Sequence, residues 1–130
     1  IFLGWQHLLE NGRIARLPRL HPVEPYARLS RARAAGDARG LWEGITDQYS
    51  IAGGTCTLQS LEALSRSGGT PVEVSDAAAA QAQQRLERRG LSTELSSAAA
   101  LAAVSRLRRS GVLDAESSVV LMVTSDGRRG

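Results

Sequence analysis

The chain has 130 residues, of which 42% are hydrophobic and 4% aromatic, and its formal net charge is +3. This length suits one domain with a modest core. No apolar run approaches the roughly 18 residues of a membrane span, so we expect a soluble protein that does not enter membranes. All 16 basic residues are arginine, and they are interleaved with acidic residues. Nucleic acid is therefore not an expected partner, because its binding modules combine dense basic patches with stacking aromatics.

The single cysteine, Cys56, cannot form an internal disulfide, which favours a reducing cytoplasm as the location. The apolar stretch 1–12 has no basic region before it and no small-residue cleavage site after it, so we do not expect a signal peptide. Cys56 is expected to be a half-buried helix residue, with catalytic use as the alternative. His7 and His21 lie on different predicted elements with no ligand at metal spacing, so no metal site is predicted.

The first half of the chain predicts two helices and one short strand. Apolar residues at spacings of three and four predict a helix over 2–11, which Gly12 ends. Prolines on both sides of 20–24 favour a short strand there. Residues 26–36 are predicted to form a helix with exposed arginines. Residues 36–55 contain several glycines and lack periodicity, which predicts a loop over the surface.

Helix and strand patterns alternate in the second half. A helix that begins near residue 56 is predicted to end at the glycines of 67–69, and alternating valines predict a strand over 71–74. Ser75 or Asp76 is expected to cap the following helix, which continues to Gly90.

The last predicted helix is capped by Ser96 or Ser97 and closed by Gly111, and its many alanines allow a neighbouring helix to approach closely. The apolar run 119–123 predicts a final strand buried on both faces, because a half-exposed strand would alternate. The repeated order of strand and helix predicts an α/β fold with three layers. We expect the three strands to share one mostly parallel sheet with helices on both faces.

Two hydroxyls, a carboxylate and a glycine follow this last strand, at Thr124, Ser125, Asp126 and Gly127. Ligands of open parallel sheets bind beyond the carboxyl ends of the strands, so these residues predict a binding crevice. Gly127 would allow a close backbone approach there. An ordinary turn is the alternative, since Ser, Asp and Gly are all frequent turn residues.

Three segments in this order resemble pyridoxal-phosphate (PLP) enzymes of fold type II, the tryptophan synthase β-like superfamily, and in particular threonine synthases and their relatives. They are residues 12–25, 60–79 and 90–127. The shared features are a Gly-x-Ile followed by Leu-Pro, a strand that ends in Ser-Asp, a Glu before a Ser-Ala-Ala helix, and a final apolar strand. The resemblance spans nearly the whole chain. It implies β- or γ-elimination or replacement on a small amino-acid substrate with pyridoxal 5'-phosphate as cofactor.

The resemblance also implies cofactor contacts at Thr124, Glu94 and Ser125. Thr124 is expected to hydrogen-bond the pyridine nitrogen of the cofactor, and Glu94 to lie near the ring. Ser97 matches the start of the helix beneath the ring. The family commonly ends its last strand in Thr-Gly-x-Gly, whereas Ser125 and Asp126 follow the threonine here. An inward-turned carboxylate at Asp126 would disturb the electrostatics.

The chain contains no lysine, although this family binds its cofactor covalently through one, and it shows no glycine-rich phosphate cup. We therefore expect 1–130 to be a single α/β unit, an incomplete C-terminal portion of a larger catalytic domain that is inactive alone. A missing N-terminal half or a partner chain would supply the lysine, and the complete enzyme is expected to be a homodimer. The alternative is a non-catalytic regulatory or degenerate α/β module that assembles with a partner chain.

Overall fold

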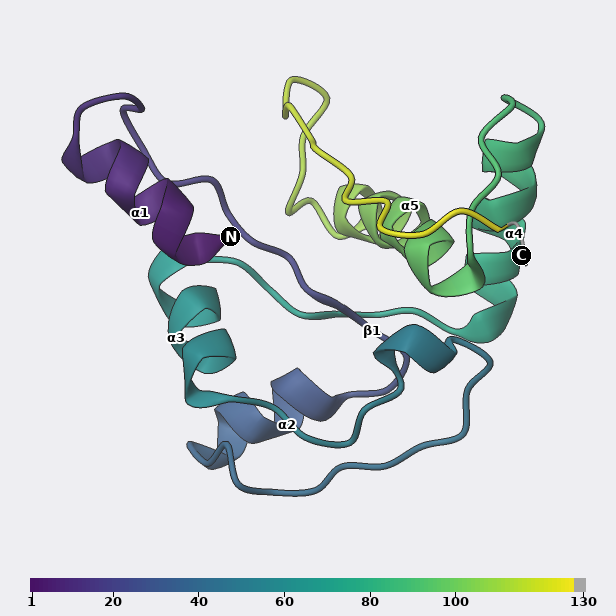
Figure 1. Cartoon of the computed structure of the whole chain (residues 1–130), viewed down its shortest axis with the longest axis horizontal. Helices are drawn as coiled ribbons and strands as arrows, with labels where there is room; N and C mark the ends of the chain where they lie inside the picture. The colour runs from purple at the N-terminus through teal and green to yellow at the C-terminus, as the bar shows by residue number, and fades with distance from the viewer. Residues whose placement is uncertain (128–130) are drawn as a thin grey trace.

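The computed structural model describes residues 1–127, which form five α-helices, one short 3-10 helix and two strands (Figure 1). In chain order the elements are α1 (Phe2–Glu10), β1 (Val23–Glu24), α2 (Arg28–Ala35), η1 (Tyr49–Ile51), α3 (Leu58–Ser67), β2 (Val72–Glu73), α4 (Asp76–Glu87) and α5 (Leu95–Arg109). Each predicted helix is confirmed within one to a few residues.

The two strands pair in parallel, with Val23 opposite Val72 and Glu24 opposite Glu73. Backbone hydrogen bonds of 2.9 Å run from Val72 N to Pro22 O and from Val74 N to Glu24 O, which continues the ladder past the two-residue strands. The parallel pairing of the predicted strands 20–24 and 71–74 is confirmed, although both strands are shorter than predicted.

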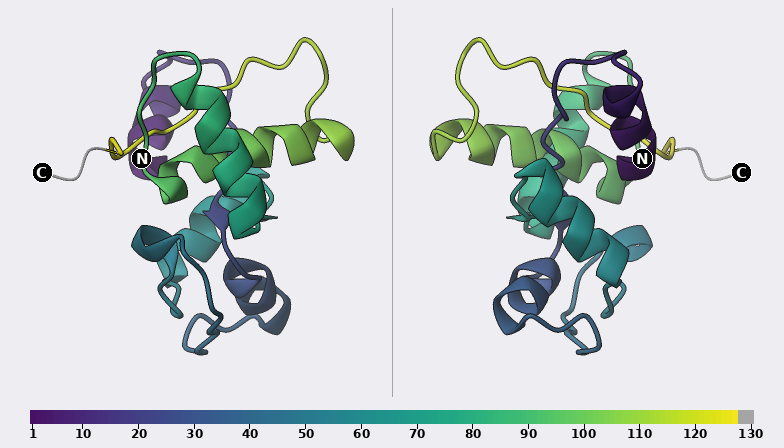
Figure 2. Two further views of the ribbon diagram at one scale, coloured as in Figure 1. Left: turned by 90° about the vertical axis from the view of Figure 1, so that its right-hand side faces the viewer. Right: turned by 90° about the vertical axis from the view of Figure 1, so that its left-hand side faces the viewer.

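Helices cover both sides of this strand pair, with α5 above it and α2 below it in Figure 1. The main core lies between the strand β2, helix α4 and helix α5, and its buried members are Val72, Val74, Ala79, Ala99, Ala103, Leu107 and Leu113. Figure 2 shows that α4 crosses α5, and the two helices pack against each other. The buried alanines permit this close approach, as the sequence predicted. The fold is therefore mixed α/β with a short parallel sheet, in agreement with the predicted class.

On the other side of the sheet, Glu24 joins β1 to α2. Its side chain is completely buried. The carboxylate accepts hydrogen bonds from Leu29 N at 2.6 Å, from Ser30 N at 3.4 Å and from Ser30 Oγ at 3.1 Å. No basic side chain pairs with Glu24 in the described part of the chain. The positive end of the α2 dipole compensates its charge instead.

Local signals place most helix ends. Gly68 ends α3 with a left-handed backbone at φ 67°, and Ser75 caps α4 by accepting a hydrogen bond from Ala78 N at 3.3 Å. The predicted cap of α5 is wrong, because Glu94 occupies the N-cap position and Ser96 and Ser97 lie buried in the first turn. The Ser97 hydroxyl contacts the segment 124–125 and is not available to cap its own helix.

The predicted strand at 119–123 is wrong. Within residues 1–127 this segment has no strand beside it, and the side chains of Val120 and Met122 are 84% and 58% exposed. Figures 1 and 2 show it as an extended yellow segment that follows α5, apart from β1 and β2. An apolar run favours burial, but a strand also needs a neighbouring backbone that can pair with it. The described chain offers no such neighbour to 119–123.

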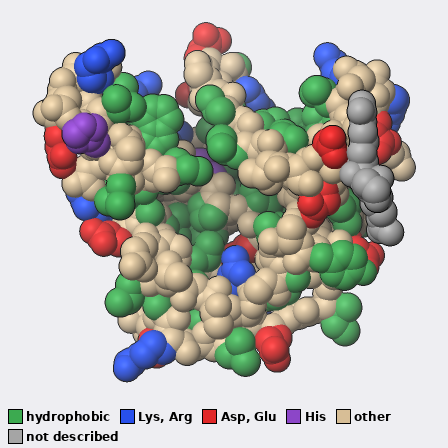
Figure 3. Space-filling model, viewed as in Figure 1, with side chains coloured by type: hydrophobic (Ala, Val, Ile, Leu, Met, Phe, Trp, Pro, Cys, Tyr) green, Lys and Arg blue, Asp and Glu red, His purple; other side chains and the backbone are tan. Residues whose placement is uncertain are grey.

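Other apolar side chains also reach the surface, as the green atoms in Figure 3 show. Leu3 is 76% exposed, and no residue of α1 is buried, so the predicted apolar face of this helix is left largely uncovered. Across residues 1–127 no helix combines the length and the hydropathy that a membrane span requires.

Candidate functional site

The N-terminus of α5 and the segment after residue 123 form a cluster of polar groups, which we call the hydroxyl cluster: Glu94, Ser97, Thr124 and Ser125. Ser97 Oγ lies 3.3 Å from Thr124 Oγ1 and accepts a hydrogen bond from Ser125 N at 3.2 Å. Glu94 N donates to Ser125 O, also at 3.2 Å. The structure therefore brings together the three residues singled out from the sequence, Thr124, Ser125 and Glu94, and adds Ser97 as the group that joins them.

Gly127 allows the terminal segment to lie against the link before α5. A Cβ atom at this position would stand 2.7 Å from Thr93 O and 3.1 Å from Ser92 Oγ, which is too close for any other residue without a shift of the backbone. The close backbone approach predicted for Gly127 is thus made to the protein's own chain. It holds Thr124 and Ser125 beside the first turn of α5.

Glu94 is held in its charged form. The hydrogen bond that the Ser50 hydroxyl donates to its carboxylate is the largest influence and lowers the pKa of Glu94, and the hydroxyls of Ser96 and Ser125 lower it further. The negative charge also lies at the positive end of the α5 dipole. Sequence reasoning missed Ser50, because it comes from the predicted surface loop, 44 residues away, and no local pattern marks it.

The groups of the cluster differ in accessibility. Thr124 and Ser125 are exposed and Glu94 is partly exposed, whereas Ser97 is buried. Ser97 therefore holds the cluster together from the protein interior, while Glu94, Thr124 and Ser125 are accessible to a ligand. No arginine pairs with Glu94 in the described residues. The exposed part of the cluster offers neutral hydroxyls and one carboxylate, which suits a ligand with a neutral acceptor or donor rather than an anionic group.

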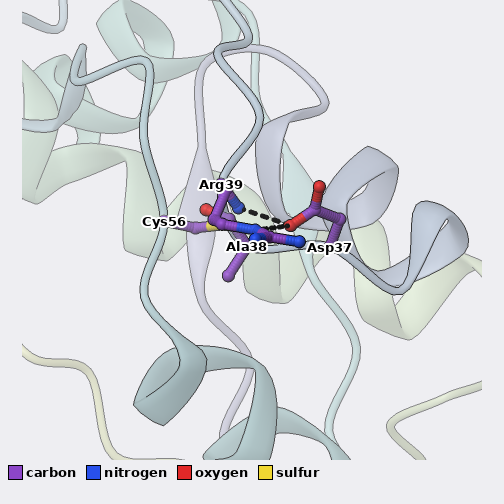
Figure 4. A network of polar contacts seen from close by, with 4 residues as sticks. All are labelled: Asp37, Ala38, Arg39 and Cys56. Carbon is purple, nitrogen blue, oxygen red and sulfur yellow. Dashed lines mark hydrogen bonds and ion pairs between the residues drawn. The ribbon is translucent and has the colours of Figure 1, made fainter.

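The remaining sequence candidates lie elsewhere. Figure 4 shows Cys56 packed beside the turn of Asp37 and Arg39, with its thiol 3.7 Å from Ala38 O. It precedes α3 and is not the helix residue that the sequence predicted. Its catalytic use gains no support, since no other side chain in the described part of the chain bonds to the thiol. His21 contacts the backbone of Thr70, and no group of three metal-ligating side chains occurs in residues 1–127.

The fold and the cluster together define an α/β domain whose candidate ligand site lies at a helix N-terminus and is built from hydroxyls. The family model described as "Pyridoxal-phosphate dependent enzyme" matches residues 2–125 of this chain. Because the match covers nearly the whole sequence, the chain belongs to that family, whose cofactor is pyridoxal phosphate. None of the curated proteins compared with the chain matches it.

The described residues fit one side of this cofactor. A pyridine nitrogen is a single hydrogen-bond acceptor in an aromatic ring, and the exposed hydroxyls of Thr124 and Ser125 are donors of matching chemistry. The covalent and phosphate ends of the cofactor have no counterpart here. The sequence contains no lysine, and the glycine pair Gly53–Gly54 accepts bonds from Arg28 and Trp42 within its own loop.

Proposed function

We propose that this chain forms the ring-nitrogen side of the cofactor site in a threonine synthase-like PLP enzyme of fold type II. The reaction is β- or γ-elimination or replacement on a small amino acid. The proposal rests on one observation above the others: Thr124 Oγ1 lies 3.3 Å from Ser97 Oγ at the start of α5, in a chain that belongs to the PLP-dependent family.

The chemistry of a hydroxyl at this position accounts for the reaction class. Pyridoxal phosphate supplies an electron sink for the carbanions that amino acids form. A neutral hydroxyl at Thr124 leaves the ring nitrogen largely unprotonated, whereas a carboxylate would hold it protonated. The weaker electron sink favours elimination and replacement over transamination.

Each residue of the hydroxyl cluster then has a role. Thr124 hydrogen-bonds the ring nitrogen, and Ser97 orients Thr124 from beneath. Glu94 lies near the ring as a carboxylate, which is consistent with its lowered pKa. Ser125 is the second candidate for the ring nitrogen, because it is also exposed and its backbone is held by the same Ser97 hydroxyl.

The complete enzyme must contain groups that this chain lacks. A lysine for covalent cofactor binding and a phosphate cup are expected from a further N-terminal portion or from a partner chain, since no lysine occurs in residues 1–130. In this proposal 1–130 is the C-terminal portion of a larger cytoplasmic catalytic domain, and the complete enzyme is a homodimer.

The test is Thr124→Val in the complete enzyme, which keeps the size and β-branching of the side chain but removes its hydroxyl. A lost hydrogen bond costs about 1–3 kcal/mol, so the rate should fall roughly ten- to a hundredfold. Thr124→Asp should instead increase transamination side products. Thr93→Val is the matched control, because its hydroxyl is buried without a hydrogen-bond partner among the described residues. Wild-type activity and cofactor absorbance in Thr124→Val would shift the assignment to Ser125.

A non-catalytic α/β module that assembles with a partner chain is the second candidate. The absence of lysine and the exposed apolar segment 119–123 favour it. Retention of the cofactor by the natural full-length protein after addition of pyridoxal phosphate separates the two functions. Sodium borohydride reduces a covalently held imine to a stable amine, so the cofactor then stays with the protein after denaturation and desalting, whereas the module leaves the cofactor free and removable.

A further inference from the structure

The loop 46–51 lies between the N-termini of α4 and α5 and makes hydrogen bonds to both helix ends. At its first end the carboxylate of Asp76, the first residue of α4, accepts three hydrogen bonds from successive loop residues. Thr46 Oγ1 donates at 2.6 Å, Asp47 N at 2.9 Å and Gln48 Nε2 at 2.8 Å. These bonds, that of Thr46 foremost, lower the pKa of Asp76, so the carboxylate remains charged at neutral pH.

Gln48 fastens the same loop to the sheet. Its side chain is completely buried and donates a second hydrogen bond to Val74 O, at 2.8 Å, just beyond β2. The backbone of Gln48 also donates to Thr46 Oγ1 at 3.0 Å. The helix η1 begins at the next residue, so Ser50 follows directly on a rigidly held backbone. From there the Ser50 hydroxyl donates to the carboxylate of Glu94.

The charges of the two helix ends suit the neutral donor groups that the loop 46–51 places between them. Asp76 and Glu94 are both acidic residues at helix N-termini, where the helix dipole stabilises them. A direct contact between them would be repulsive. The hydroxyl of Thr46, the amide of Gln48 and the hydroxyl of Ser50 instead donate to the two carboxylates in turn.

We propose that the loop 46–51, anchored on Asp76, orients the Glu94 carboxylate toward the cofactor through Ser50, which makes Ser50 a positioning residue of the PLP site. The role of Glu94 beside the ring rests on the proposed function. The link from Asp76 through Ser50 to Glu94 is independent of it. The glycine-rich segment that looks like a surface loop in the sequence is thus part of the functional site.

The pKa of Glu94 reports this link with a definite sign. The charged side chains in the loop 46–51, in the first turn of α4 and in 124–127 are Asp47, Asp76 and Asp126, all acidic. Removing any of them therefore lowers the pKa of Glu94 if only charge matters. Loss of the hydrogen bond from Ser50 raises it. An Asp76 substitution that raises the pKa of Glu94 must therefore act through the loop.

The experiment is a ¹³C NMR titration of the Glu94 carboxyl in the complete enzyme, without cofactor, with the signal assigned by Glu94→Gln. Ser50→Ala should raise the pKa of Glu94, and Ser50→Thr, which keeps the hydroxyl, should restore it. Asp76→Ala should also raise it. Asp47→Ala is the matched control, because it removes one charge from the loop but keeps the backbone N–H that bonds Asp76. It should lower the pKa of Glu94 or leave it unchanged.

A Ser50→Ala variant with an unchanged or lowered Glu94 pKa would overturn the proposal, and so would equal shifts in Asp76→Ala and Asp47→Ala. Cofactor affinity then tests the part that rests on the proposed function. Loss of one positioning hydrogen bond costs about 0.5–1.5 kcal/mol, so Ser50→Ala should weaken binding of pyridoxal phosphate about two- to tenfold. If Glu94→Gln binds the cofactor with wild-type affinity, the proposed role of Glu94 beside the ring is wrong. The titration still tests, independently, whether the loop 46–51 orients the Glu94 carboxylate.

Discussion

Replacement of Glu24 by alanine should destabilise the fold more than any exposed substitution, although Glu24 lies outside the hydroxyl cluster. Its buried carboxylate is the acceptor for the first turn of α2, with bonds from Leu29 N, Ser30 N and Ser30 Oγ. Glu24→Ala removes all of them. Ser30 is exposed and regains water, whereas Leu29 is only 5% exposed, so its N–H remains unpaired in a dry site.

The magnitude follows from these contacts. An unpaired buried donor costs about 1–3 kcal/mol, and loss of a helix cap costs about 0.5–2 kcal/mol. The two values describe overlapping contacts, so we expect about 2–3 kcal/mol for Glu24→Ala. Glu24→Gln keeps one acceptor oxygen but turns an amide N–H₂ toward Ser30, and about half that loss is expected.

The assay is urea unfolding followed by circular dichroism, at one protein concentration for all variants. Glu73→Ala is the matched control, because Glu73 is the register partner of Glu24, is exposed and makes no side-chain hydrogen bond or ion pair in the described structure. A surface change of this kind stays within about 0.5 kcal/mol. Equal unfolding midpoints for Glu24→Ala and Glu73→Ala would refute the capping role.

Three further outcomes are expected. Gly127→Ala should detach the terminal segment, because its Cβ would stand 2.7 Å from Thr93 O. Hydrogen exchange at the Glu94 amide, which donates to Ser125 O, should then become faster, and an unchanged exchange rate would contradict this prediction. Burial lowers the pKa of the folded-state His21 imidazole below its usual 6.5, so the unfolded chain takes up a proton at a higher pH than the folded chain does. The free energy of unfolding should therefore fall as the pH drops from 6.5 through the pKa of folded His21. His21→Gln should make the urea midpoint less dependent on pH over that range, and an unaltered slope would exclude His21 as the cause. The chain 1–130 should self-associate through its exposed apolar residues. Val120→Lys should shift the sedimentation coefficient toward that of the monomer. If the wild-type chain already sediments as a monomer, the prediction of self-association is wrong.

Helix positions were predictable from the sequence because their signals are local. Gly68 adopts the left-handed backbone that ends α3, and Ser75 caps α4. The strand at 119–123 was not predictable in the same way, because its apolar residues specify burial but not the neighbouring backbone that a strand requires. The N-cap of α5 was misplaced for a related reason. Ser97 has the right residue type for a cap, but its hydroxyl is engaged by residues almost thirty positions later in the chain.

In the candidate site, too, some residues could be predicted from the sequence and one could not. Thr124, Ser125 and Glu94 were named from a family pattern, and the structure brings these three residues close together around Ser97. Ser50 carries no such pattern. It lies in a segment without periodicity, and its contact with Glu94 becomes visible only when the chain is folded.

Helix α5 packs in the core along most of its length, and its first turn also carries Ser97 of the hydroxyl cluster. Ala103 and Leu107 pack in the core, while Ser97 holds Thr124 and Ser125. Leu107 and Ser97 are ten residues apart, or about 15 Å along the helix axis. A tilt of about 5° at the core would therefore displace Ser97 by about 1.3 Å, more than the tolerance of a hydrogen bond. A change in the volume of a buried alanine such as Ala103 can therefore shift the hydroxyl cluster although that alanine is not part of it.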